Sequence, residues 1–156
     1  MRIGVVSDTH GLLRPEALAA LAGCNHILHA GDVGDAAILD VLGRLAPVTA
    51  IRGNIDRSGA CSALPATEAV SIGGRLFFLV HSIHDLDLHP AAAGIAAVIY
   101  GHSHQPATDW KDGVLYFNPG SAGPRRFRLP VTVGILECTA EQITPTIIPL
   151  EVGYPE

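Results

Sequence analysis

Short apolar runs recur along the chain and, in its first half, alternate with segments of helical periodicity. Four of these runs predict buried strands, over residues 2–6, 25–30, 47–51 and 95–100. Pro15 begins a predicted helix over 15–21, and Asp35 is in the N-cap position of a second over 36–45. This alternation of strands and helices predicts an α/β domain with buried parallel strands.

The second half of the chain has the turn residues of β-hairpins. Gly73-Gly74 separates two predicted strands, 69–72 and 75–80, and Asp112-Gly113 separates two more, 107–111 and 114–117. Two further strands are expected near the end of the chain, over 131–137 and 143–150. The connections are predicted as an irregular segment, a loop or short helix, and a turn, over 56–66, 85–93 and 118–121.

The composition narrows the class of protein. A chain of 156 residues is long enough for a single domain over 1–156 with a buried core. Hydrophobic residues make up 48% and charged residues 16%, which excludes a disordered chain. The net charge of −5 gives no indication of a nucleic-acid groove or of binding to an anionic membrane surface.

Cysteine usage and the lengths of the apolar stretches indicate a cytoplasmic location. Cys24, Cys61 and Cys138 are far apart, and an odd number of cysteines makes a poor disulfide framework. The apolar stretch at the N-terminus is too short for a signal peptide, and no stretch approaches the length of a membrane span. We therefore expect a cytoplasmic protein.

Five apolar runs end in polar residues that can bind a metal ion. These residues are Asp8 with His10, Asp32, Asn54, His81, and His102 with His104. In an extended chain the i, i+2 spacing of each pair places both side chains on one face, and ligands gather beyond the carboxyl ends of parallel strands. The mixed oxygen and nitrogen set suits Mn, Fe, Co, Ni or Zn, and seven ligands suit two ions if one carboxylate bridges them. The alternative for His102 and His104 is a pair of polar residues at a strand end.

The ordered motifs Asp-x-His, Gly-Asp, Gly-Asn, His and Gly-His-x-His resemble those of the calcineurin-like metallophosphoesterase superfamily. Residues 7–11 and 118–121 are similar to its small bacterial and archaeal phosphodiesterase branch. The resemblance implies a four-layer α/β/β/α sandwich of two mixed sheets. It implies one divalent ion bound by Asp8, His10, Asp32 and His104. The second would be bound by Asp32, Asn54, His81 and His102, with Mn as the expected ion and Fe, Co, Ni or Zn as alternatives.

The resemblance also implies a reaction, which is hydrolysis of a small phosphate ester, in particular a phosphodiester. The attacking group would be a hydroxide that bridges the two metal ions and attacks phosphorus in line. The rival interpretation is a non-catalytic protein-interaction scaffold of the same fold, similar to a retromer subunit with a degraded metal site. The seven intact ligand positions favour the enzyme. A nuclease is disfavoured by the negative charge, no membrane partner is expected, and a homo-oligomer stays open.

Two positions depart from the superfamily pattern. Ile55 follows Asn54 where many members carry a histidine close to the leaving group. Either the departing oxygen lacks that acid, or Ile55 packs under the Asn54 loop and another group donates the proton. Ser82 follows His81 where a glycine is common, which affects the local turn rather than the ligand.

Other polar residues have two interpretations each. His26 and His29 lie within a predicted strand, where structural hydrogen bonding is favoured over a functional role. His84 and His89 follow a ligand loop and either line the substrate mouth or form an exposed rim.

Two further segments have open roles. Residues 118–121 either offer backbone N–H groups to a phosphate or form a plain turn. Arg125, Arg126 and Arg128 either bind a substrate phosphate or belong to a solvated or subunit-contact face. Cys24 and Cys138 are expected in the core.

Overall fold

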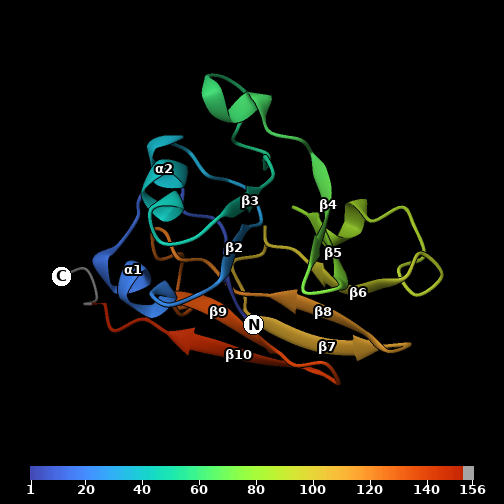
Figure 1. Ribbon diagram of the computed structural model, residues 1–156. Helices are drawn as coiled ribbons and strands as arrows, with labels where there is room; N and C mark the ends of the chain where they lie inside the picture. Colours follow the sequence, from blue (N-terminus) through green and yellow to red (C-terminus); the bar gives the residue numbers. More distant parts are fainter. Residues whose placement is uncertain (153–156) are drawn as a thin grey trace.

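Two five-stranded sheets pack face to face in the computed structural model, which describes residues 1–152 (Figure 1). The first sheet consists, in spatial order, of β10 (Ile143–Pro149), β9 (Thr132–Cys138), β1 (Arg2–Val6), β2 (His26–His29) and β3 (Val48–Ala50). The second consists of β4 (Thr67–Ile72), β5 (Arg75–Val80), β6 (Ile95–Ile99), β8 (Val114–Asn118) and β7 (Ala107–Lys111). The helices are α1 (Pro15–Leu21), α2 (Ala37–Gly43) and two 3₁₀ turns, η1 (Ala60–Ala63) and η2 (Ile83–Asp85).

Both sheets are mixed: the parallel strands form one side of the first sheet and the centre of the second. Strands β1, β2 and β3 are parallel to one another, and so are β5, β6 and β8. The antiparallel pairs are the hairpins β4–β5, β7–β8 and β9–β10 and the pair of distant strands β1–β9. Because parallel strands end at the same edge of a sheet, the loops that follow β1, β2 and β3 meet at one edge.

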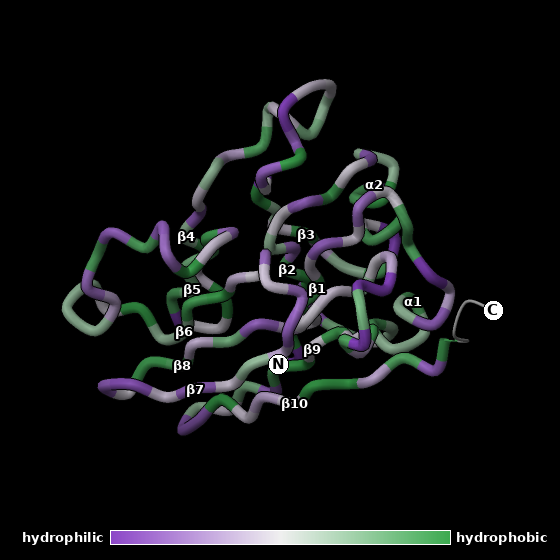
Figure 2. The backbone as a smooth tube through the Cα atoms, turned by 180° about the vertical axis from the view of Figure 1, so that it is seen from behind, coloured by the Kyte–Doolittle hydropathy of each residue, from purple (hydrophilic) through white to green (hydrophobic). Residues whose placement is uncertain are grey.

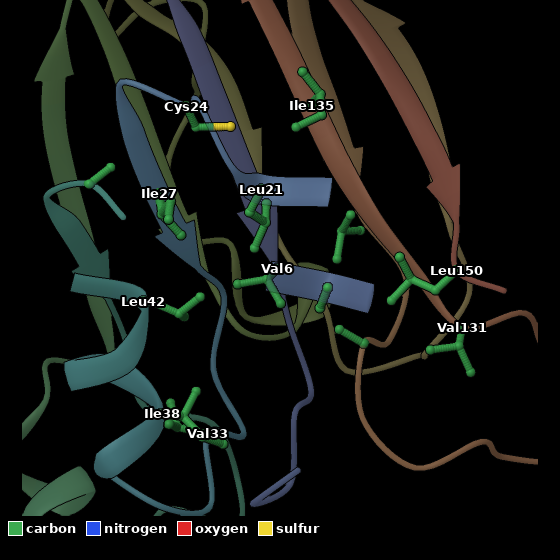
Figure 3. Close-up of a cluster of buried hydrophobic side chains, with 14 of the residues drawn as sticks. Val6, Leu21, Cys24, Ile27, Val33, Ile38, Leu42, Val131, Ile135 and Leu150 are labelled. Atoms are coloured by element: carbon green, nitrogen blue, oxygen red, sulfur yellow. The ribbon is translucent and has the colours of Figure 1, made fainter. Parts of the chain in front are cut away.

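Alternation along β1 divides the interior into two cores. Val6 faces the helices and packs with Leu21, Leu42 and Ile27, as Figure 3 shows. Ile3 and Val5 face the second sheet instead and belong to the core between the sheets. Successive side chains of a strand point to opposite faces, so β1, which is covered on both faces, is buried almost continuously and contributes to both cores.

The outer face of the second sheet has its own small core. Val80 and Val98 pack there against η2 and the following turn, through Ile83, Leu86 and Leu88. Figure 2 shows that β5, β6 and β8 are largely hydrophobic, whereas β7 at the margin of the sheet is mostly hydrophilic. The predicted α/β sandwich of two mixed sheets is confirmed, and within residues 1–152 the layer over the second sheet is η2 and its loop.

The predicted elements are found with small shifts at their ends. Helix α1 and both hairpins are confirmed. Helix α2 was predicted over 36–45 but is shorter, and its N-cap residue is Ala36 rather than Asp35. Asp35 still accepts a hydrogen bond from Ala37 N at 2.9 Å, so it acts on the first turn from one position further out. No helix in the described part of the chain has the length and apolar character of a membrane span.

Candidate metal centre

All seven predicted ligands lie at the same edge of the sandwich, each just beyond a strand. Asp8 and His10 follow β1, Asp32 follows β2, and Asn54 comes after β3. In the second sheet His81 follows β5 directly, and His102 and His104 come after β6. Hydrogen bonds join these loops across the sandwich, from His102 N to Asp8 Oδ2 at 3.1 Å and between His81 Nδ1 and Ala30 O at 2.7 Å.

The first group of side chains surrounds Asp8. Its Oδ1 atom lies 3.8 Å from His10 Nε2 and 3.5 Å from His104 Nε2. The centroids of the two imidazole rings are 5.2 Å apart. Asp8 and His104 are buried, whereas His10 is partly exposed. One carboxylate and two imidazoles therefore converge on a single point, as ligands of one ion would.

The second group surrounds His81. Its Nε2 atom lies 3.0 Å from Asn54 Oδ1, and His102 Nδ1 lies 3.2 Å from the same oxygen. The rings of His81 and His102 are 5.2 Å apart. Asn54 and His102 are exposed, so this group forms the open side of the centre.

Asp32 lies between the two groups. Its Oδ2 atom is 3.4 Å from His10 Nε2 and 3.3 Å from His81 Nε2. Asp8 Oδ1 also approaches His81 Nε2, but at the longer distance of 3.9 Å. The shorter distances favour Asp32 as the carboxylate shared between two ligand sets.

Two buried atoms of the centre fit a cation. Asp8 Oδ1 and His10 Nε2 are buried and have no hydrogen-bond partner among the described residues. Buried polar atoms without partners are costly, and a cation would satisfy them. The Asn54 amide does not decide the matter: with its nitrogen inward it donates to His81 and Asp32, and with its oxygen inward it can accept from a ring N–H or bind a cation. The fit therefore rests on Asp8 Oδ1 and His10 Nε2.

The charge state of Asp32 suits a ligand. Burial by itself raises its pKa, but hydrogen bonds from His81 and from the backbone N–H of Ile55, with the nearby His81 and His10, outweigh burial and lower the pKa to about 2. For His81 burial acts in the opposite direction and lowers the pKa. The hydrogen bonds to Asp32 and to the Ala30 carbonyl outweigh burial and raise the pKa above its usual value. Asp32 is thus a carboxylate at neutral pH even without a cation.

The backbone at the ligands is strained. Five ligand residues have positive φ, with values of 55° at Asp8, 47° at His10, 55° at Asp32, 71° at His102 and 62° at His104. Side chains other than glycine rarely adopt this region, and such residues cluster at functional sites. The sequence argument that each i, i+2 pair shares one face of an extended chain is wrong here, because both members of each pair have left-handed φ values. Asp8 and His10 converge in the first group, whereas His104 joins that group and His102 the second.

Glycines before three of the ligands allow the loops to touch. A side chain on Gly31 would collide with the His81 ring, and one on Gly53 would collide with Asp32. A side chain on Gly101 would collide with Ser7 and Asp8. These contacts explain why glycine precedes the ligand in Gly-Asp, Gly-Asn and Gly-His.

Asp56 supports the centre and was not assigned a role from the sequence. Its buried carboxylate accepts backbone N–H bonds from Val33 at 3.1 Å, Gly34 at 3.0 Å and Gly53 at 2.9 Å. It therefore ties the Asp32 loop to the Asn54 loop. The available signal was an acidic residue shortly after Gly53-Asn54 in an otherwise irregular segment.

His29 has the structural role that the sequence predicts. Its Nδ1 accepts the N–H of Gly31 at 3.1 Å, and its Nε2 lies 2.9 Å from Thr9 Oγ1. Since the Thr9 hydroxyl donates to the Val33 carbonyl, Nε2 carries the ring proton and the neutral form satisfies both contacts. Burial accordingly lowers the pKa of His29 to about 4. The prediction for His26 is confirmed as well, by its contact with Thr49 Oγ1 at 2.9 Å.

Substituting His29 should flatten the acid side of the stability profile. The unfolded chain takes up the proton near pH 6.5 and the folded chain only near pH 4. The free energy of unfolding therefore falls between these two values as the pH decreases, by up to about 3 kcal/mol, and not further below them. His29→Gln lacks this contribution, whereas His26→Gln, on the same strand but half-buried, should change the slope less. Urea unfolding across this pH range would contradict the assignment if wild type and His29→Gln had equal slopes.

The segment over 118–121 is a structural turn. Asn118 Nδ2 donates to Gly101 O and to Ser103 Oγ, each at 3.1 Å, and so holds the loop that carries His102. The N–H groups of Gly120 and Ala122 bond to Asn118 Oδ1 and Ser7 O. The partner of the Gly120 N–H inside the protein favours the plain-turn interpretation.

The outlying histidines and cysteines differ in their surroundings. His84 and His89 are both exposed, as the rim interpretation expects. His89 lies beside a separate cavity at the outer face of the second sheet, with Leu86 and Tyr116. Cys24 is buried in the core, as predicted, and Cys138 is half-buried.

Two cavities open beside the centre. The larger, of about 460 Å³, borders Asn54, His81 and His102 and also contacts Arg52 and Asp85. The smaller, of about 160 Å³, borders the other group and is lined by His10, His104, Pro124, Arg125 and Arg126. A ligand over the centre would therefore have one cavity on each side.

Comparison with known proteins agrees with this geometry. The family model described as the calcineurin-like phosphoesterase superfamily domain matches residues 1–141. A probable metallophosphoesterase of Methanocaldococcus jannaschii is 32% identical over 97% of this chain and 82% of its own length. The phosphodiesterase YfcE of Escherichia coli is 27% identical over 88% of both chains.

Solved structures share the fold. A predicted phosphoesterase from Streptococcus pneumoniae superposes with a TM-score of 0.75 at 23% identity, over 99% of this chain and 92% of that one. Vps29 from Chaetomium thermophilum also gives a TM-score of 0.75, at 14% identity, over 96% of this chain and 99% of that one. At these identities the likeness concerns the fold alone.

Proposed function

Because the chain belongs to the calcineurin-like phosphoesterase superfamily, we propose that it is a phosphodiesterase that uses two divalent metal ions. The proposal treats residues 1–156 as one domain that hydrolyses a small phosphate ester. Mn²⁺ is the proposed ion, with Fe, Co, Ni or Zn as alternatives suited to the same ligands. A cytoplasmic location is part of the proposal, and the three free cysteines support it.

One observation carries the proposal, which is the position of Asp32 between two ligand groups. Asp32 Oδ2 lies within 3.4 Å of an imidazole nitrogen from each group, His10 on one side and His81 on the other. The proposed first ion has the ligands Asp8, His10, Asp32 and His104. The proposed second ion has the ligands Asp32, Asn54, His81 and His102.

The residues of the centre determine where the ions and the reacting phosphate of the substrate would lie. When bound, two divalent cations would activate a water molecule and neutralise the oxygens of the phosphoryl group. The buried carboxylates of Asp8 and Asp32 form the floor of the centre, and the neutral side chain of Asn54 lies at its open side. A neutral group at the opening limits the negative charge that an anionic substrate meets. Asp56 holds the loops of Asp32 and Asn54 at a fixed separation.

Metal removal and return test the proposal. Chelation is expected to abolish hydrolysis of bis(4-nitrophenyl) phosphate, and Mn²⁺ is expected to restore it better than Ca²⁺. The reason is that four of the seven ligands are imidazoles, which Ca²⁺ accepts poorly. Metal content should be measured on the same samples. Undiminished activity after complete metal removal, or equal recovery with Ca²⁺, would contradict the proposed centre.

A protein-interaction scaffold is the second candidate. The observation that favours it is the shared fold with Vps29, which extends over nearly the whole of both chains. The buried atoms without partners at Asp8 and His10 favour the enzyme instead. A well-folded protein that hydrolyses no phosphodiester with any of the proposed metal ions would support the scaffold.

A further inference from the structure

The segment after Asn118 is fixed against the first ligand loop. Ser121 Oγ donates to the Asp8 carbonyl at 3.0 Å, and Ala122 N donates to Ser7 O at 3.1 Å. Gly123 packs directly on the carbonyls of Asp8 and Thr9, where a side chain would collide. The residues that follow Gly123 are therefore held beside the metal centre.

This anchoring brings a positive charge to the smaller cavity. Arg126 lines that cavity together with His10 and His104. Arg126 is exposed, and within residues 1–152 it makes no ion pair with a carboxylate. The guanidinium is thus close to the centre and available to a ligand.

The two cavities differ in charge. The smaller one has Arg125 and Arg126 in its lining and no carboxylate. The larger one has both signs, with Arg52 and Asp85. A phosphodiester over the centre has two ester arms, and the two arms would meet different electrostatic surroundings. The protein as a whole has a net charge of −5, so the basic lining of the small cavity contrasts with its surroundings. The ester arm that enters this cavity is therefore the one on which a negative charge would be favoured.

We propose that Arg126 selects substrates in which one ester arm carries a second oxyanion, bound in the small cavity beside His10. This inference rests on the proposed phosphodiesterase function and names the substrate class of that site. The planar guanidinium donates two parallel hydrogen bonds to a phosphate, phosphonate or carboxylate group. Arg126 is a specificity residue in this proposal, since it contacts the arm and not the scissile bond.

Three 4-nitrophenyl phosphodiesters with the same leaving group test the inference. Their second arms are 2-phosphonoethyl, 3,3-dimethylbutyl and 2-trimethylammonioethyl, which are anionic, neutral and cationic and have similar size. In the wild type, kcat/KM for the anionic arm is expected to exceed that for the neutral arm about tenfold, as one charge-assisted contact supplies. The cationic arm should be the poorest substrate.

Variants of two arginines assign the effect. Arg126→Gln should bring the ratio of kcat/KM between the anionic and neutral arms close to one, and Arg126→Lys should keep part of it. Arg128→Gln is the matched control, because Arg128 is exposed in the same loop but does not line the cavity. Equal ratios in Arg126→Gln and Arg128→Gln, or no charge preference in the wild type, would overturn the inference while leaving the phosphodiesterase intact. Failure to hydrolyse any of the three esters would overturn both proposals.

Discussion

Asp32→Asn is expected to remove both metal ions and almost all hydrolysis while the fold remains. Asp32 Oδ2 lies between His10 and His81, so both proposed ions lose a charged ligand at once. The loss should be at least about 10³-fold, because removing even a single stabilising donor from an active site costs 10²–10³-fold. Asparagine keeps an oxygen that can accept the Ile55 N–H bond, now 3.0 Å long, so the loop can keep its shape.

Two further variants assign the bridge. Asp8→Asn should lower the content of only one ion, because Asp8 Oδ1 lies 3.5 Å from His104 Nε2 in the first group and 3.9 Å from His81 Nε2 in the second. Asp40→Asn changes the charge equally on an exposed face of α2 and should retain two ions and full activity. Metal analysis and circular dichroism on the purified variants measure both properties. Loss of both ions in Asp8→Asn and of only one in Asp32→Asn would assign the bridge to Asp8.

The strands could be predicted from the sequence because their burial is strongly patterned. Four of the five residues of β1 are buried, and Gly73-Gly74 marks the first hairpin. The pairing of distant strands could not be predicted in the same way. Strand β9 lies beside β1, with Arg2 opposite Glu137, and nothing local to either strand specifies this partner. Pairing over such a separation depends on the whole core.

The ligands could be predicted from their positions after apolar runs, but their geometry could not. Asp8 and His10 adopt left-handed φ values against their local preference. Tertiary hydrogen bonds hold them there, from Asp8 N to Gly31 O at 3.0 Å and from His10 N to Asp32 O at 2.9 Å. Such strain is set by the neighbouring loop and not by the residues themselves.

The supporting residues show the same limit. His29 was predicted correctly, because a histidine inside a buried strand needs hydrogen-bond partners. Asp56 looks like an ordinary polar loop residue in the sequence. Its role in joining two loops depends on Val33 and Gly34, more than twenty residues earlier, because its carboxylate accepts hydrogen bonds from their N–H groups.

Ile55 lies at the open side of the centre. Its side chain is 42% exposed, so it does not pack under the Asn54 loop. Its N–H group donates to Asp32 Oδ1 at 3.0 Å, which places the residue directly beside the proposed bridging carboxylate. The side chain at this position has no acidic proton to donate. The ring nitrogens of the neighbouring His81 already contact Ala30 O and Asp32. The leaving oxygen of a substrate therefore has no proton donor at residue 55.

The absence of an acid at residue 55 should make the reaction sensitive to the leaving group, and Ile55→His should reduce that sensitivity. A leaving oxygen without a general acid departs with most of its negative charge, so kcat/KM of the wild type should fall steeply as the leaving-group pKa rises across a series of phosphodiesters. General acid catalysis typically contributes about 10²–10⁴-fold, and Ile55→His should recover about 10²-fold for alkoxide leaving groups and little for 4-nitrophenolate. Ile55→Phe is the control for the size of the ring, since it adds an aromatic side chain that has no acidic proton to donate. A flat dependence in the wild type would show that another group already donates the proton, and equal gains in the two variants would attribute the effect to packing rather than to acid catalysis.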